Sequence, residues 1–166
     1  MNYFFLDASA IIKRYIPETG TPKMNYFFAS VPSYRMMCLF EGGGEVIFVF
    51  GRRRNEGRIT ATRFNQIKQR FLTEIIHHSE IVRTLPTKNQ IGRSWELIEK
   101  HSLNSTDAIL LQCALDKVSE MLPDGDNLVL ASSDKRLLRA AQNEGLLTFN
   151  PETDSQTALD VLIDPP

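Results

Sequence analysis

Short apolar runs alternate along the chain with segments in which apolar residues recur at helical spacing. Four of these runs are typical of buried strands. They lie at residues 3–6, 81–82, 128–131 and 146–149. Strands that alternate with helices favour a parallel sheet covered by helices on both faces. The pattern therefore predicts an α/β fold, a three-layer α/β/α sandwich with a central parallel sheet.

The segments between the runs predict the helices. Ile67 and Phe71 are four residues apart and follow Thr60, a residue typical of helix N-caps. Further helices are expected at residues 9–15, around 95–98, from 105 onward and over 135–144. Trp95 is expected in the core, and Gly145 is well placed to end the last of these helices.

Two stretches give weaker signals. Residues 18–23 predict a loop. The three glycines at 42–44 precede the apolar helical positions Val46 and Phe50. Because each glycine inside a helix costs about 1 kcal/mol relative to alanine, this helix is expected to begin near Glu45.

A chain of 166 residues is long enough for one domain with a substantial core. Residues 1–150 are expected to form this domain, and residues 151–166 an acidic C-terminal tail without a basic residue. Residues 1–5 recur as residues 24–28 (Met-Asn-Tyr-Phe-Phe), a match that is too short to indicate a structural repeat.

The composition is that of an ordinary globular protein, with 42% hydrophobic and 23% charged residues. No segment approaches the roughly 20 apolar residues of a membrane span, so no membrane association is expected. Two cysteines, Cys38 and Cys113, are too few for a disulfide framework and predict reduced thiols in a cytoplasmic protein.

Charge is unevenly distributed although the formal net charge is only −1. Residues 52–70 hold seven basic residues against the single acid Glu56. This asymmetry is typical of a protein with one basic face, and a solvated helix surface explains it equally well.

Acidic residues stand where apolar segments end. Asp7 follows the run at 3–6, Asp134 follows the run at 128–131 after two serines, and Asp107 opens a helical pattern. The carboxyl ends of parallel strands and the first turns of the following helices face one crevice, where such folds bind ligands. Carboxylates that meet there would repel one another unless a cation lay between them. Hard oxygen ligands favour Mg²⁺ or Mn²⁺.

These motifs together resemble the PIN domain family, the fold of VapC-like toxin ribonucleases of type II toxin–antitoxin systems. The resemblance covers nearly all of the chain. It rests on residues 6–10 (Leu-Asp-Ala-Ser-Ala), 45–57, 105–108 (Ser-Thr-Asp-Ala) and 130–137 (Leu-Ala-Ser-Ser-Asp-Lys-Arg-Leu). It implies that residues 1–150 form a PIN-like nuclease domain.

The resemblance also implies a set of metal ligands. One or two Mg²⁺ or Mn²⁺ ions would be bound by Asp7, Glu45, Asp107 and Asp134. Phosphodiester hydrolysis needs an activated water and a neutralised leaving oxygen, and divalent metals held by carboxylates supply both. The glycines at 42–44 leave Glu41 open as the alternative to Glu45, which we favour.

Substrate and partners follow from the same resemblance. An RNA substrate would contact Arg52, Arg53, Arg54, Ser9 and Ser133. An antitoxin protein and a homodimer are the expected partners. The alternative is a catalytically inactive PIN-like module that acts by binding a partner or RNA.

Overall fold

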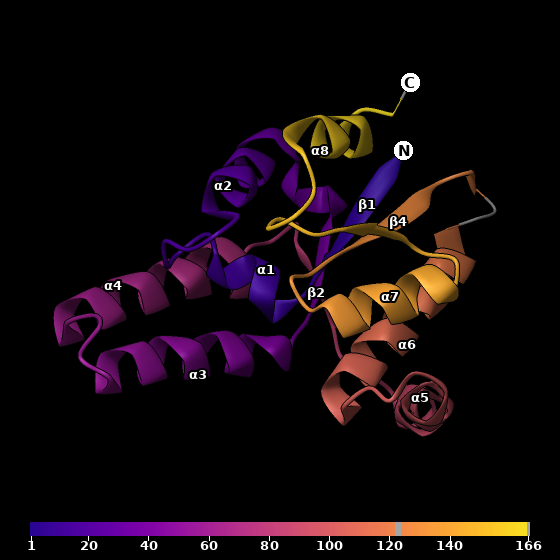
Figure 1. Ribbon diagram of the computed structural model, residues 1–166, viewed down its shortest axis with the longest axis horizontal. Helices are drawn as coiled ribbons and strands as arrows, with labels where there is room; N and C mark the ends of the chain where they lie inside the picture. The colour runs from indigo at the N-terminus through magenta and orange to yellow at the C-terminus, as the bar shows by residue number, and fades with distance from the viewer. Residues whose placement is uncertain (122–123, 166) are drawn as a thin grey trace.

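Five parallel strands form the centre of the protein in a computed structural model, which describes residues 1–121 and 124–165 (Figure 1). The sheet order is β3-β2-β1-β4-β5. The strands are β1 (Asn2–Leu6), β2 (Met36–Leu39), β3 (Val82–Thr84), β4 (Asn127–Ala131) and β5 (Leu147–Phe149). The predicted α/β sandwich with a parallel sheet is confirmed, and β2 is a strand that the sequence pattern did not reveal.

The strand order reverses at the middle of the sheet. From the central strand β1 the chain adds β2 and β3 on one side, then β4 and β5 on the other. β1 and β4 are therefore neighbours, with Leu6 opposite Ala131. The backbone N–H of Asp7 extends this pairing by donating to the Ala131 carbonyl over 3.0 Å. A crevice at the carboxyl ends of two such strands is the usual ligand site of doubly wound folds.

Helices cover both faces of the sheet, because successive strand residues point to opposite sides. Phe4 and Leu6 belong to one buried cluster and Phe5 to the other. The first cluster is covered by α1 (Ala8–Ile12), α2 (Thr21–Ser30), α3 (Gly42–Asn55), α4 (Ala61–Phe71) and α8 (Gln156–Ile163). The second is covered by α5 (Lys88–His101), α6 (Ser105–Met121) and α7 (Lys135–Asn143).

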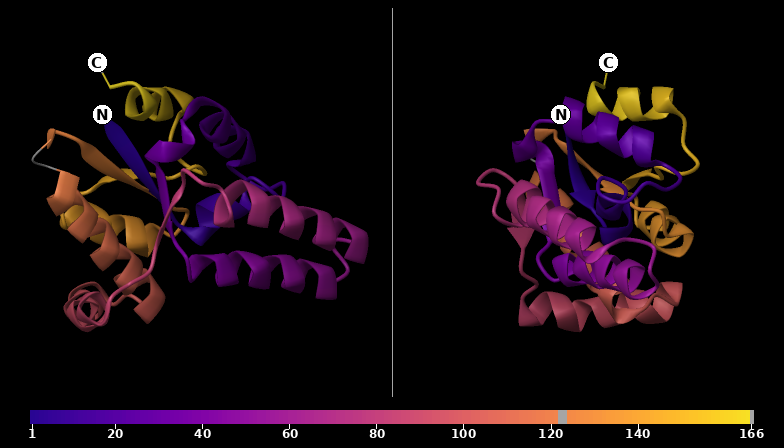
Figure 2. Two further views of the ribbon diagram at one scale, coloured as in Figure 1. Left: turned by 180° about the vertical axis from the view of Figure 1, so that it is seen from behind. Right: turned by 90° about the vertical axis from the view of Figure 1, so that its left-hand side faces the viewer.

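Helices α3 and α4 lie side by side and project away from the sheet (Figures 1 and 2). The prediction that α3 begins near Glu45 is wrong, because the helix begins at Gly42. Gly43 is buried, and a Cβ there would come within 3.0 Å of Ile76 Cδ1. The missing side chain lets α3 approach the π-helical turn Leu72–Ile76. Packing thus offsets the low helix propensity of glycine.

Helix α2 begins at Thr21, inside the segment expected to be a loop. It contains the second copy of the repeated pentapeptide, whereas residues 2–5 of the first copy lie in β1. The fourth residues of the two copies, Phe4 and Phe27, are fully buried and meet edge to face with ring centroids 4.9 Å apart. The same Asn-Tyr-Phe-Phe sequence therefore forms a strand in one place and a helix in the other.

Residues 151–165, expected as an acidic tail, include helix α8, which lies beside α2 (Figure 1). Leu159 and Ile163 of α8 are buried in the core. The buried Arg35 donates to the carbonyl of Ile163 over 2.8 Å and to that of Asn2 over 2.7 Å. Pro166, the last residue of the expected tail, lies outside the described residues.

Smaller predictions had mixed outcomes. Thr60 caps α4 by accepting from the Arg63 N–H, and Gly145 follows α7 with a φ of 86°, as expected. Trp95 is 63% exposed, so its expected place in the core is wrong. Across residues 1–121 and 124–165, no helix combines the length and the apolar character needed to cross a bilayer.

Candidate active site

Asp7 is the most tightly held carboxylate of the predicted set. It follows β1 directly, caps the N-terminus of α1 and is 7% exposed. Its Oδ2 atom accepts hydrogen bonds from the Ser132 hydroxyl at 2.8 Å, the Ser9 N–H at 3.2 Å and the Ser9 hydroxyl. Within the described part of the chain, no hydrogen bond falls on Oδ1. One carboxylate oxygen is therefore fixed, and the other is left for a ligand.

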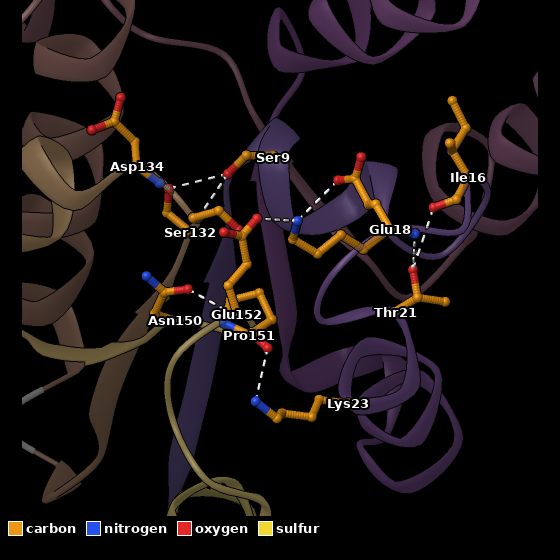
Figure 3. Close-up of polar contacts among 12 residues, drawn as sticks. Ser9, Ile16, Glu18, Thr21, Lys23, Ser132, Asp134, Asn150, Pro151 and Glu152 are labelled. Atoms are coloured by element: carbon orange, nitrogen blue, oxygen red, sulfur yellow. Dashed lines mark hydrogen bonds and ion pairs between the residues drawn. The ribbon is translucent and has the colours of Figure 1, made fainter. Parts of the chain in front are cut away.

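The two serines connect Asp7 to the loop after β4, and Figure 3 shows Ser9 beside Ser132 and Asp134 of that loop. The Ser9 and Ser132 hydroxyl oxygens are 3.2 Å apart, and Ser132 Oγ accepts from the Asp134 N–H at 3.0 Å. The Ser133 N–H donates to Ser9 Oγ at 2.9 Å. Ser132 was not among the residues predicted from the sequence. The register could have identified it, because Leu6 lies opposite Ala131 and Asp7 therefore reaches the next residue, Ser132.

A buried lysine fixes the other end of α1. The Lys13 side chain is 2% exposed, and its Nζ lies 2.9 Å from Glu18 Oε1 and 2.6 Å from Glu152 Oε1 (Figure 3). Gly20, in the turn before α2, has a φ of 90°, and a Cβ there would lie 2.7 Å from the Pro151 carbonyl oxygen. The turn between α1 and α2 thus packs against the loop after β5. This contact fixes the position of α1, the helix that Asp7 caps.

Asp107 and Asp134 both lie at helix N-termini. Asp134 caps α7 and accepts from the N–H groups of Arg136 at 2.7 Å and Leu137 at 3.3 Å. Asp107 lies in the first turn of α6, and its Oδ2 accepts from Asn104 Nδ2 at 2.8 Å. Both positions are favoured for carboxylates by the helix dipole.

The four predicted carboxylates share one electrostatic environment. Asp107 is half-buried, and burial is the largest cause that raises its pKa from 3.8 to about 6. The charges of Asp7, Asp134 and Glu45 raise this pKa further, and that of Arg136 lowers it. The raised pKa shows that Asp107 is repelled by three other carboxylates, and a divalent cation would relieve this repulsion.

Glu45 interacts electrostatically with Asp7, and Glu41 does not share this environment. Partial desolvation and the charge of Asp7 raise the pKa of Glu45, and hydrogen bonding to the Thr106 side chain lowers it. Glu41 is exposed at the start of α3, and its charge instead contributes to the raised pKa of Cys113. The charge of Glu45 therefore acts together with those of Asp7, Asp107 and Asp134, and we refer to the region of these four carboxylates at the carboxyl ends of β1 and β4 as the acidic crevice.

The carboxylates share this environment without converging on one point. Among residues 1–121 and 124–165, no three His, Cys, Asp or Glu side chains are grouped closely enough to hold a metal ion. The chemistry of the donors nevertheless fits Mg²⁺ or Mn²⁺, since all four are hard carboxylate ligands and Asp7 Oδ1 accepts no hydrogen bond from the described residues. A cation would have to draw Glu45 and Asp107 towards Asp7.

The predicted RNA contacts lie in different surroundings. Arg52, Arg53 and Arg54 occupy the last turn of α3, at least about 10 Å along the helix from Glu45. Arg53 is partly buried and pairs with Glu18 at 3.5 Å, while Arg52 and Arg54 are exposed. The Ser133 hydroxyl is buried and has no hydrogen-bond partner among the described residues. Contact of these residues with RNA stays a prediction.

An acidic crevice at the switch point of a doubly wound parallel sheet defines this protein as an α/β protein with a candidate cation site. The chain is similar to FitAcB from Neisseria gonorrhoeae, with a TM-score of 0.62 at 14% identity over 91% of this chain and 99% of that chain. It is also similar to PAE2754 from Pyrobaculum aerophilum, with a TM-score of 0.57 at 15% identity over 96% and 94% of the two chains. The chain thus has the PIN-domain fold that its sequence predicted. No protein-family model and no curated protein matches its sequence.

The serine contacts to Asp7 predict different effects for two adjacent substitutions. Ser132→Ala removes a hydrogen bond to a buried carboxylate and should lower the free energy of unfolding by about 1.5–3 kcal/mol. Ser133→Ala removes a buried hydroxyl without a described partner, so it should not lower the free energy of unfolding. Urea denaturation of both variants tests this difference. Equal losses would contradict the role given to Ser132.

The raised pKa of Asp107 predicts how stability depends on pH without metal. Between pH 3.8 and about 6 the folded chain binds more protons than the unfolded chain, so this contribution to stability falls as pH rises through that window. Asp107→Asn should therefore raise the Tm in EDTA above about pH 6, and the gain should vanish near about pH 4. Thermal denaturation at both pH values, with the exposed Glu99→Gln as control, measures this gain. A gain independent of pH would contradict it.

Proposed function

We propose that the chain is a Mg²⁺- or Mn²⁺-dependent ribonuclease that hydrolyses RNA phosphodiester bonds. The observation that carries this proposal is the buried Asp7, fixed through one oxygen at the switch point of a PIN-like sheet, with the charges of three further carboxylates acting on the same region. Asp7, Asp107 and Asp134 come from three separate segments of the chain. Repulsion among them is costly to maintain in a folded protein, and a cation site is a function that accounts for it.

The residues of the crevice have distinct roles in this proposal. A bound divalent ion supplies charge neutralisation for the phosphate and lowers the pKa of a water nucleophile. Asp7 would present Oδ1 to this ion, because Oδ2 is held by Ser9 and Ser132. Glu45 and Asp107 would complete the ligand set. Asp134, which caps α7 through its Oδ1, would act through water.

A toxin role and its partners rest on the VapC-like resemblance of the sequence together with the PIN-domain fold. The proposed antitoxin would inhibit the enzyme by covering the acidic crevice with a segment of its own. The proposed homodimer comes from the same resemblance. In this account RNA and the antitoxin compete for one surface, so inhibition should be relieved by excess substrate.

One observation favours a second candidate, a PIN-like module that binds RNA or a partner without cutting. The carboxylates are not grouped as a metal site within the described residues. If they cannot converge, the crevice would bind no cation with useful affinity. Metal-dependent cleavage of RNA distinguishes the two candidates, because only the ribonuclease would cleave.

Cleavage of a pool of unstructured oligoribonucleotides tests the proposed activity. The parent should cut in Mn²⁺ and stop in EDTA, and Asp7→Asn should lower the rate by more than about 100-fold because the central ligand is lost. Asp160→Asn, a similar change on α8 far from the crevice, should cut like the parent. Thermal denaturation shows whether Asp7→Asn remains folded. If folded Asp7→Asn cuts as fast as the parent, the proposed site is wrong, and a parent that cuts no RNA would favour the binding module.

A further inference from the structure

A second polar cavity lies between the end of α5 and α7, beside the acidic crevice. Its volume is about 300 Å³. Its walls include Lys100, His101, Ser102, Arg136, Arg139 and Asn143. No carboxylate is among its lining residues, and four of these six side chains can carry a positive charge. We refer to this cavity as the basic pocket.

Two of the basic side chains form a fixed wall. Lys100 Nζ lies 2.8 Å from Glu144 Oε1, and His101 Nε2 lies 2.5 Å from the same oxygen. These contacts lower the pKa of Glu144, so its carboxylate is charged and anchors both groups. Glu144 thereby neutralises one positive charge of this wall. The further charge of the pocket comes from α7.

The two arginines of α7 are poorly paired. Arg136 approaches Asp134 only at 4.0 Å, the outer limit of an ion pair, and is 59% exposed. Arg139 is exposed and forms no ion pair with any residue that the structure describes. Being three residues apart on one helix, the two side chains leave from the same face. Two guanidinium groups without strong partners, on the wall of one cavity, are suited to an anion.

The basic pocket adjoins the acidic crevice through Arg136 and the helix that Asp134 caps. Arg136 lines the pocket, and its charge also acts on Asp107. Asp134, a carboxylate of the crevice, caps the helix that carries both arginines. Arg52, Arg53 and Arg54, by contrast, lie at the far end of α3 and do not contribute to the pKa of Asp107 or Glu45. Of these two groups of arginines, the pair on α7 is the closer to the site of the proposed cleavage.

We propose that the basic pocket binds a phosphodiester group of the RNA chain next to the bond placed in the acidic crevice. Arg139 and Arg136 would bind the phosphate oxygens, and the wall of Lys100 and His101 would close the pocket on the other side. The planar guanidinium group matches phosphate oxygens in a bidentate geometry. The strand would then pass over Asp134, from carboxylates that hold a cation to arginines that hold the neighbouring phosphate. This inference rests on the proposed function and adds to it a subsite for the substrate.

Salt-dependent binding of RNA tests the subsite. The full chain carrying Asp7→Asn, which prevents cleavage, is titrated against a fluorescent single-stranded oligoribonucleotide by anisotropy between about 50 and 200 mM salt. Arg139→Gln should weaken binding several-fold and reduce the slope of log Kd against log salt by about 0.7, the value for one phosphate contact on a single strand. Arg139→Lys should keep most of the slope. The parent in EDTA gives the same comparison without any change at Asp7.

Lys135→Gln provides the matched control. Lys135 is exposed on the same helix and carries the same charge, but it does not line the basic pocket. Its loss should leave the slope within error of that of Asp7→Asn alone. Equal effects of Arg139→Gln and Lys135→Gln would show a general charge effect and overturn the subsite, as would an unchanged slope in Arg139→Gln. If neither Asp7→Asn nor the parent in EDTA binds RNA, both the subsite and the proposal that RNA is the substrate are contradicted. If both bind RNA but Arg139→Gln does not alter the salt dependence, only the subsite is rejected.

Discussion

The candidate site depends on one buried carboxylate, Asp7, held in place by two serines. A charged group with 7% exposure is costly to bury without hydrogen bonds. Three donors, from Ser9 and Ser132, converge on one oxygen and offset this cost. Because these donors come from α1 and from the loop after β4, the position of Asp7 is set by the pairing of β1 with β4. The chemistry of the crevice and the centre of the sheet are therefore one structural unit.

The charges around this unit form two adjoining regions. In the first region the charges of Asp7, Asp134 and Glu45 raise the pKa of Asp107, and the charge of Asp7 raises that of Glu45. Arginines of α7 line a basic pocket beside them, with Arg136 at the boundary. A divalent cation in the first region and a phosphate in the second would neutralise both. An RNA backbone with a bound metal ion carries both kinds of charge, so the arrangement is consistent with a nuclease.

The sequence predicted which aspartates follow buried strands better than it predicted the intervening helices. Asp7 and Asp134 could be found because an apolar run precedes each, and a parallel sheet brings such strand ends together. Ser132 was missed because the choice between adjacent serines depends on strand register. The predicted start of α3 was wrong because Gly43 packs against Ile76. Helix propensities do not account for such packing. The pentapeptide at 1–5 and 24–28 shows that local sequence does not determine secondary structure here. Its two copies have the same residues, so only their tertiary surroundings can make one a strand and the other a helix.

Calorimetric titration with Mn²⁺ tests most directly whether separate carboxylates form one cation site. The account predicts that the parent binds Mn²⁺ and that both Asp7→Asn and Asp107→Asn lose binding, while Asp160→Asn retains it. It also predicts that affinity increases as pH rises through about 6, because Asp107 must lose its proton to become a ligand. Absence of binding by the parent, or binding that persists unchanged in both crevice variants, would contradict the account.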